Sequence, residues 1–287
     1  MTHLRKFLFS LTVLVLLIGT VIHPFPQHVR ADELSAEEVK VPIIMYHLVT
    51  ENPKYIGKYG ITPKELEADL VYLQTNGYTT IVVQDLIDFV EGGKELPYNA
   101  IMLTFDDGNS SDYNYLFPLL QKYDMKAVLA IIGKTTDEIT ANVEKNPEGK
   151  YPNLTWQQVL EMHQSGFVEI QSHGFDVHHK GGSGKKRAES AQAYHNRLYS
   201  DLSKLQEACK THLGHTPNAF IYPLGIISDG SQSVLEQLGI VASFSCYEGM
   251  AVIRQGDKDS LYCMRRSIRP NGKSVEAVLK EIKGTKE

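Results

Sequence analysis

The sequence predicts an α/β fold in which β/α units repeat around a parallel sheet or barrel. From residue 41 onward, short apolar runs alternate with amphipathic stretches, which is the pattern of β/α units. Several of the amphipathic stretches begin and end at residues typical of helix termini. The chain has 287 residues, 42% of them hydrophobic, and neither an internal repeat nor a proline-rich linker divides it after residue 40. These observations predict one domain with a sizeable core and exclude a disordered or fibrous protein.

Eight apolar runs are expected to form the strands. Each is separated from the next by a stretch with helical periodicity or by turn residues. The expected strands are residues 41–47, 79–83, 100–105, 126–132, 167–171, 219–222, 240–245 and 261–267.

Two helices have clear start signals. Thr62-Pro63-Lys64-Glu65 offers an N-cap, a proline in the first turn and the glutamate of a capping box, and Asn76-Gly77 ends this helix. Thr155 and Gln158 repeat the capping pattern, and Gly166 ends that helix. The other expected helices are residues 86–91, 113–123, 188–212, 231–237 and 274–282.

The N-terminal residues have the pattern of an export signal. Arg5 and Lys6 precede an uncharged run at 7–22, and small residues end the segment at Ala31. The run is shorter than the about 20 apolar residues that span a bilayer, so a cleaved signal is favoured over an uncleaved anchor. We expect a signal peptide at 1–31, a polar tether at 32–40 and a catalytic domain at 41–287. The mature protein is expected to be secreted or at the cell surface, with no stable membrane span.

Charge and cysteine content narrow the range of partners. Lys and Arg total 29 against 34 for Asp and Glu, which gives a net charge of -5 and no electrostatic basis for binding nucleic acid. Three cysteines are too few for a disulfide scaffold, and their odd number leaves at least one thiol free or paired with another chain. A monomer is expected.

One expected strand ends in two adjacent carboxylates. Asp106 and Asp107, followed by Gly108, come directly after the apolar run at 100–105. Successive strand residues point to opposite faces, but the turn at the carboxyl end of a strand can bring both acids to one mouth of the sheet. One could bind a metal while the other holds a water. The alternative is that one of them caps a helix beginning near Asn109.

A second polar cluster follows the strand expected at 167–171. His173 and His178 lie close to Asp176, and two imidazoles with one carboxylate are the ligands of a catalytic metal site that keeps positions open for water and substrate. Because the two histidines are five residues apart, the chain must curl after residue 172 for both to face one point. The alternative is a pair of solvated loop histidines.

His47 ends the first expected strand. If all strands are parallel, its side chain emerges at the same mouth as Asp106, Asp107 and His173. We therefore count His47 among the candidate site residues.

Together, residues 104–108 and the pair His173 and His178 resemble the polysaccharide deacetylase family, also called NodB-homology or carbohydrate esterase family 4 enzymes. The resemblance extends over about residues 41–282 and includes Met45-Tyr46-His47, which is similar to the opening motif of many bacterial members. It implies a single-domain, distorted (β/α) barrel. The spacing of the two histidines looks closest to the branch that removes N-acetyl groups from poly-N-acetylglucosamine.

The resemblance also implies roles for individual residues. Asp106 is expected to be the general base, and Asp107, His173 and His178 are expected to hold a divalent metal. Zinc is the first choice of metal, with cobalt, nickel or iron as alternatives. At residues 220–225, the backbone N–H of Leu224 is expected to bind the oxyanion, with Tyr222 beside the substrate.

Two motifs depart from the family pattern. Ile221 stands where the family has an arginine that orients the base, and Leu224 replaces an aromatic residue. No histidine follows His215, so the Leu-X-His motif that supplies the general acid is absent. The corresponding stretch, residues 261–266, ends in two arginines, which are poor proton donors. We therefore hypothesise that His47 is the general acid.

The sequence thus predicts a secreted, metal-dependent hydrolase that removes N-acetyl groups from a glucosamine-containing polysaccharide of the cell surface. The polymer could be poly-N-acetylglucosamine, peptidoglycan or a chitin-like chain. Two alternatives remain open at this point. One is an O-acetyl esterase acting on a polysaccharide, and the other is a carbohydrate-binding homologue with impaired catalysis.

Overall fold

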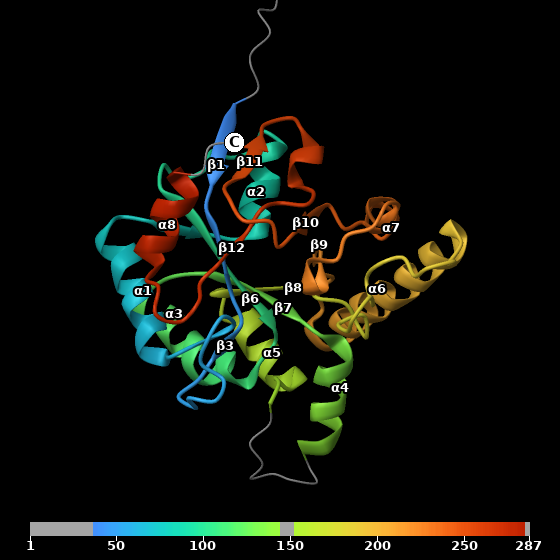
Figure 1. Cartoon of the computed structure of the whole chain (residues 1–287), viewed down its shortest axis with the longest axis horizontal. Coiled ribbons are helices and arrows are strands. Elements are labelled where there is room, and N and C mark those ends of the chain that lie inside the picture. Colours follow the sequence, from blue (N-terminus) through green and yellow to red (C-terminus); the bar gives the residue numbers. More distant parts are fainter. Residues whose placement is uncertain (1–36, 144–151, 285–287) are drawn as a thin grey trace, which may run out of the picture. The chain divides into compact units, whose positions relative to one another are not determined.

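A sheet of eight parallel strands curls round on itself at the centre of the molecule (Figure 1). The computed structural model describes residues 37–143 and 152–284, which belong to one compact unit, Ala36–Glu287. The signal peptide expected at 1–31 lies outside the described residues. The strands are β2 (Ile43–Tyr46), β5 (Thr79–Ile81), β6 (Ala100–Asp107), β7 (Ala127–Ile131), β8 (Val168–Ser172), β9 (Ala219–Ile221), β10 (Ala242–Phe244) and β12 (Ser267–Ile268).

The order of the strands is β10-β9-β8-β7-β6-β2-β12, with β5 also paired to β6. Beyond β10, the backbone of Met264 donates to Ser243 and accepts from Ser245, at 2.9 Å each. A few residues later, β12 pairs with β2. The short segment from Met264 to Ile268 therefore joins the two edges of the sheet, and the predicted distorted barrel is confirmed.

Four short strands lie outside this sheet. β1 (Glu38–Val41) pairs antiparallel with β11 (Ala251–Arg254), and β3 (Leu48–Val49) pairs with β4 (Gly60–Ile61). The strand expected at 41–47 is therefore divided, with Pro42 between β1 and β2. Proline cannot donate to a ladder and so favours such a break. The tether expected at 32–40 also differs from the structure, because its last residues belong to β1.

Most helices cover the outside of the barrel, whereas α2 (Val83–Val90) packs against the inner row of strand residues. Both predicted capping boxes are present, at Thr62 with Glu65 and at Thr155 with Gln158. The helix expected at 113–123 begins as a π-helical turn and continues without a break as an α-helix, in which Pro118 is the second residue. The helical elements are α1 (Pro63–Thr75), α2 (Val83–Val90), η1 (Asp112–Leu116), α3 (Phe117–Tyr123), α4 (Gly133–Asn142), α5 (Trp156–Gln164), α6 (Ala191–Leu213), η3 (Pro223–Gly225), α7 (Ser231–Gln237), η4 (Lys258–Leu261) and α8 (Val275–Gly284).

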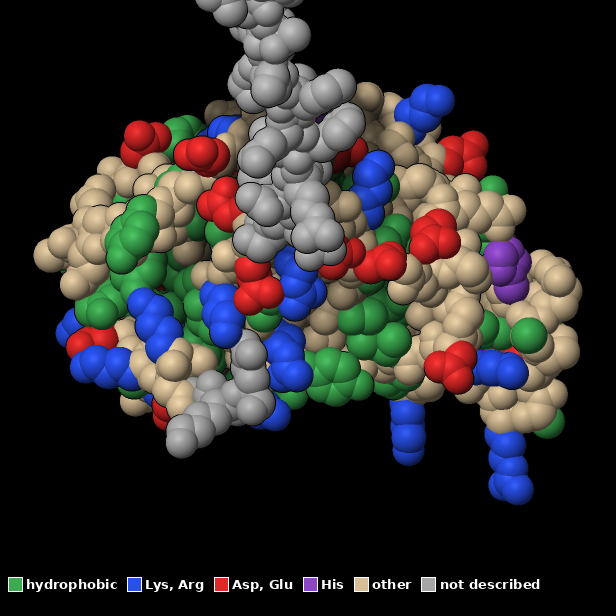
Figure 2. All heavy atoms as spheres, turned by 90° about the horizontal axis from the view of Figure 1, so that it is seen from above, with side chains coloured by type: hydrophobic (Ala, Val, Ile, Leu, Met, Phe, Trp, Pro, Cys, Tyr) green, Lys and Arg blue, Asp and Glu red, His purple; other side chains and the backbone are tan. Residues whose placement is uncertain are grey.

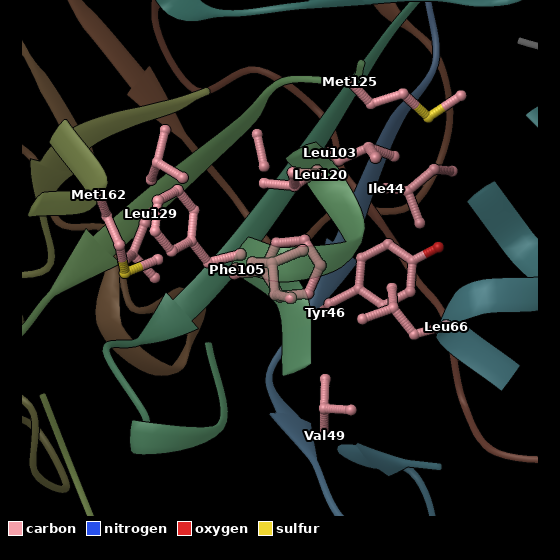
Figure 3. Packing of buried hydrophobic residues seen from close by; sticks show 14 of the residues in the cluster. Ile44, Tyr46, Val49, Leu66, Leu103, Phe105, Leu120, Met125, Leu129 and Met162 are labelled. Atoms are coloured by element: carbon pink, nitrogen blue, oxygen red, sulfur yellow. The ribbon is translucent and has the colours of Figure 1, made fainter. Parts of the chain in front are cut away.

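Alternate residues of the central strands pack on opposite sides of the sheet. One row, with Ile44, Leu103 and Leu129, packs against helix residues such as Leu66 of α1 and Leu120 of α3 (Figure 3). On the same side, the rings of Tyr46 and Phe105 are stacked with their centroids 4.8 Å apart (Figure 3). Burying each such side chain contributes about 1.5–3 kcal/mol.

The other row, with Ile43, Met102 and Val128, packs inside the curl with residues of α2 and β11. In β6 this row continues from Met102 through Thr104 to Asp106, because residues two apart share a face. The period of the strand therefore directs the Asp106 side chain into the mouth of the barrel.

On the face shown in Figure 2, acidic and basic side chains are interspersed among polar and hydrophobic ones. Among residues 37–143 and 152–284, no helix has the length and hydropathy needed to cross a membrane.

Candidate active site

A cleft of about 600 Å³ opens at the carboxyl ends of the parallel strands. Its floor is formed by residues that end or follow β2, β6 and β8, as expected for a site on a barrel of β/α units. The lining residues are Met45, His47, Leu48, Tyr55, Lys58, Tyr59, Asp106, Asp107, Asn109, His173, His178, Leu224, Cys246, Glu248 and Ile268.

A change of backbone direction brings the two adjacent aspartates to the same cleft. Asp106 follows the inward row of β6, and Asp107 has a φ of 81°, in the left-handed region that non-glycine residues rarely occupy. Such a conformation costs on the order of 1–3 kcal/mol and occurs preferentially at functional sites. Neither side chain caps η1, so the alternative interpretation of the pair as a helix cap does not hold.

The three expected metal ligands come together. One ligand atom from each of Asp107, His173 and His178 lies within 4.8 Å of the others. Nε2 of His178 is 3.1 Å from Oδ1 of Asp107, and Nε2 of His173 is 3.5 Å from the same oxygen. The chain therefore curls after β8, as the spacing of the two histidines required.

A hydrogen bond fixes the orientation of the buried His173 ring. Its Nδ1 lies 2.9 Å from the carbonyl oxygen of Ile221, and a carbonyl can only accept, so Nδ1 carries the proton. The lone pair of Nε2 then faces Asp107. A backbone carbonyl on the second nitrogen is the usual support of a metal-binding histidine. One carboxylate and two imidazoles with this support fit a divalent cation such as zinc.

The charges in the cluster reinforce one another. Burial alone would raise the pKa of Asp107, but the nearby imidazoles of His173 and His178 hold that pKa far below its ordinary value. The Asp107 carboxylate, 3.1 Å from Nε2 of His178, raises the pKa of His178. Asp107 is therefore ionised at neutral pH, the state in which a carboxylate binds metal.

His47 lies beside the second aspartate. Its Nε2 is 3.9 Å from Oδ2 of Asp106, too far for a direct hydrogen bond. Its Nδ1 is buried and has no hydrogen-bond partner among the described residues. Burial lowers the pKa of His47, although the charges of Asp106 and Asp107 oppose this shift. The structure thus places His47 in the cleft, as we expected from its position at the end of a parallel strand.

The sequence did not identify the partner of Asp106. Arg266 donates from Nη1 and Nη2 to the two carboxylate oxygens of Asp106, at 2.8 and 2.9 Å. It also donates to the hydroxyl of Thr104 and to the carbonyl oxygen of Ser245. Burial of Asp106 would raise its pKa, but the charges of Arg266 and His173, together with the hydrogen bonds from Arg266, lower it. An arginine from the segment that closes the barrel thus contacts Asp106, where Ile221 cannot.

A second residue that the sequence did not reveal supports the metal ligands. Asp201 of α6 accepts hydrogen bonds from the backbone N–H groups of Phe175 and Asp176, at 2.8 Å each. These groups belong to the loop between His173 and His178. Asp201 therefore holds the loop that sets the spacing of the two imidazoles.

The two residues expected at the oxyanion differ in their placement. Leu224 lines the cleft and has a left-handed backbone, with a φ of 57°. The side chain of Tyr222 instead is buried against α6 and α7, and its hydroxyl lies 2.8 Å from that of Ser231. Residue 222 follows Ile221, which packs inside the barrel, so the alternation of the strand turns Tyr222 away from the cleft. The expectation that Tyr222 lies beside the substrate is not met.

Known proteins share this fold. A solved de-N-acetylase from Aggregatibacter actinomycetemcomitans is 27% identical, with a TM-score of 0.71 over 84% of this chain and 99% of that one. A deacetylase from Streptococcus pyogenes, 22% identical, shares the fold with a TM-score of 0.68 over 86% of this chain and 99% of that one.

Curated relatives are named poly-β-1,6-N-acetyl-D-glucosamine N-deacetylase. One from Escherichia coli O157:H7 is 29% identical over 75% of this chain but only 35% of its own length, so this chain spans about a third of that relative. One from Staphylococcus epidermidis is 25% identical over 85% of this chain and 80% of its own. A family model described as "Polysaccharide deacetylase" matches residues 93–243, which include both aspartates and both histidines. The chain therefore belongs to the polysaccharide deacetylase family.

Proposed function

We propose that this chain is a metal-dependent deacetylase that removes N-acetyl groups from a glucosamine-containing polysaccharide at the cell surface. The observation that carries the proposal is the convergence of Asp106, Asp107, His173 and His178 on one cleft, with three ligand atoms within 4.8 Å. The relatives named for poly-β-1,6-N-acetyl-D-glucosamine support that polymer as the first substrate to test. Export follows from the signal expected at 1–31.

Asp107, His173 and His178 would hold the metal. When bound there, a divalent cation would polarise the acetyl carbonyl and lower the pKa of a water from about 15.7 toward about 7. The protein supplies the remaining features of the site. The Ile221 carbonyl fixes the ring of His173, and the low pKa of Asp107 keeps that carboxylate ionised.

Asp106 is suited to take the proton of the attacking water. Arg266 occupies both of its oxygens with hydrogen bonds, which fixes the carboxylate in the mouth of the barrel and keeps it ionised. A carboxylate in this state is ready to accept a proton. In this proposal Asp106 is the base and Asp107 is a metal ligand, although the two are adjacent in sequence.

His47 is suited to return a proton to the departing amine. It lies on the same cleft, and its Nε2 is 3.9 Å from Oδ2 of Asp106, so both groups face the same part of the cleft. An amine is a poor leaving group unless it is protonated, and imidazole is the most common general acid in enzymes. The backbone N–H of Leu224 would donate to the oxyanion formed on water attack.

Measuring acetate release from different substrates distinguishes the proposal from its two alternatives, an O-acetyl esterase and a binding homologue. An O-acetyl esterase would need less protonation of the leaving group, and the missing Leu-X-His motif makes this alternative worth testing. Acetate release should be compared between N-acetylglucosamine oligomers and acetylated xylan. Faster release from the oligomers supports the proposal, and release from xylan alone would replace it with the esterase. Binding of oligomers without release from either would indicate the binding homologue.

A further inference from the structure

The cleft has a wall of exposed aromatic residues that the proposed chemistry does not use. Tyr55 and Tyr59 both line the cleft, and their exposed fractions are 54% and 52%. Both belong to the segment between β3 and β4, here called the tyrosine loop (residues 50–60). A pair of large, half-exposed rings at the mouth of a site is the kind of surface that a ligand covers.

The tyrosine loop is held in a defined shape. The backbone N–H of Leu48 donates to Tyr59, that of Gly57 donates to Gly60, and that of Asn271 donates to Gly57, at 2.8 to 3.0 Å. A Cβ at Gly60 would lie 2.0 Å from the carbonyl oxygen of Tyr55, so only glycine fits there. The rings are therefore presented by an organised loop, which lowers the entropic cost of binding a ligand.

The loop also contacts the catalytic centre. The ring of Tyr59 packs edge-on against the imidazole of His47, with centroids 4.9 Å apart. Lys54 and Lys58 lie over the rings of Tyr55 and Tyr59, at 5.4 and 5.2 Å from their centroids. The wall therefore begins beside His47 and offers both apolar ring faces and hydrogen-bond donors.

We propose that the tyrosine loop is a subsite for pyranose rings of the glycan that flank the unit being deacetylated. This inference rests on the proposed function. A glucosamine polymer presents apolar ring faces edged by hydroxyl groups, which matches aromatic rings accompanied by tyrosine hydroxyls and an ammonium group. Because the loop lies next to His47, a ring on Tyr59 and the reacting acetyl group belong to adjoining units, and the enzyme requires an oligomer.

Tyr55 gives the sharper test because its side chain is half-exposed, so its removal leaves the core unchanged. The measured quantity is kcat/KM for acetate release from the N-acetylglucosamine pentasaccharide, divided by the value for the disaccharide. We expect Tyr55→Ala to lower this ratio about five- to tenfold, mainly through KM for the pentasaccharide. Tyr98→Ala is the matched control, because Tyr98 is fully exposed and does not line the cleft.

An unchanged ratio in Tyr55→Ala, or an equal loss on both substrates, would overturn the subsite. If the unaltered protein releases acetate from neither substrate, the proposed function fails, and the subsite is then tested by binding alone. In that case calorimetry of the metal-free protein with the pentasaccharide is decisive. Binding that Tyr55→Ala weakens and Tyr98→Ala does not supports the subsite, and equal or absent binding overturns it.

Discussion

Arg266 donates two hydrogen bonds to the carboxylate of Asp106, and both side chains are buried. The two residues are 160 positions apart in the sequence. Arg266 lies in the segment that joins the two edges of the curled sheet. The segment that closes the barrel therefore also holds the Asp106 carboxylate in place. This pair explains how the Asp106 carboxylate is positioned without an arginine at residue 221.

Replacing Arg266 by lysine should change the pH dependence of catalysis. Lysine keeps a positive charge but cannot make the paired hydrogen bonds of a guanidinium. Because Arg266 lowers the pKa of Asp106, its replacement should raise that pKa and move the acidic limb of kcat/KM to higher pH. Arg265→Lys serves as the control, since the Arg265 side chain is exposed and bonds only to the Glu248 carbonyl. Identical acidic limbs in the two variants would refute the role of Arg266.

Metal content should separate the two adjacent aspartates. Asp107→Ala and His178→Ala each remove one of three ligands and should abolish stoichiometric metal binding, measured by elemental analysis after dialysis. Asp106→Asn should retain the metal and lose turnover, because Asp106 is not a ligand in this assignment. Turnover preserved in Asp106→Asn would show that the assigned base is wrong.

Asp201 should increase metal affinity by holding the loop between His173 and His178 in place. Asp201→Ala removes the acceptor of two backbone N–H groups between the histidine ligands. Loss of such outer support typically weakens metal binding about 10–100-fold. Competition with a chelator of known affinity measures the effect, and Glu207→Gln, an exposed change on the same helix, is the control. Equal affinities for the two variants would mean that the loop keeps its shape without Asp201.

His47 should matter more for amides than for activated esters. His47→Gln removes the proposed proton donor, and general acid catalysis contributes about 10²–10⁴-fold. We expect a loss of that size on N-acetylglucosamine oligomers and a much smaller loss on an aryl acetate, whose leaving group departs without protonation. Equal losses on both substrates would exclude His47 as the acid.

Glu65 should stabilise the protein only while it is ionised. Hydrogen bonds from Gly272, Thr62 and Arg269 outweigh its burial and lower its pKa to about 2, from 4.5. A depressed pKa contributes stability above pH 4.5 that is lost as the pH falls toward 2. Urea unfolding at pH 5 and pH 3 should therefore show a smaller acid loss for Glu65→Gln than for the unaltered protein. Glu95→Gln, at an exposed loop position, should behave like the unaltered protein.

Most of the barrel is predictable from the sequence because its strands are buried on both faces and read as continuous apolar runs. The capping boxes at Thr62 and Thr155 also mark their helices correctly. The prediction missed α4, whose sequence has little apolar periodicity, and the pairs β1-β11 and β3-β4, which are too short to give a pattern.

The candidate site is predictable where its residues end strands. The carboxyl ends of parallel strands lie at the same end of the barrel. This rule predicts the positions of Asp106, Asp107, His173 and His47. It does not predict those of Arg266 and Asp201, because their contacts join segments 160 and about 25 residues apart and no local pattern records such pairs. Tyr222 was placed by its nearness to Leu224 in sequence, but the period of the strand directs it to the other side of the sheet.

The central claim is tested most directly by measuring acetate release from N-acetylglucosamine oligomers before and after chelation, with zinc, cobalt or nickel then restored singly. The account predicts release that chelation abolishes and at least one metal restores, and no restoration in His178→Ala. Release that persists after complete removal of metal, or its absence with every metal added, would contradict the account.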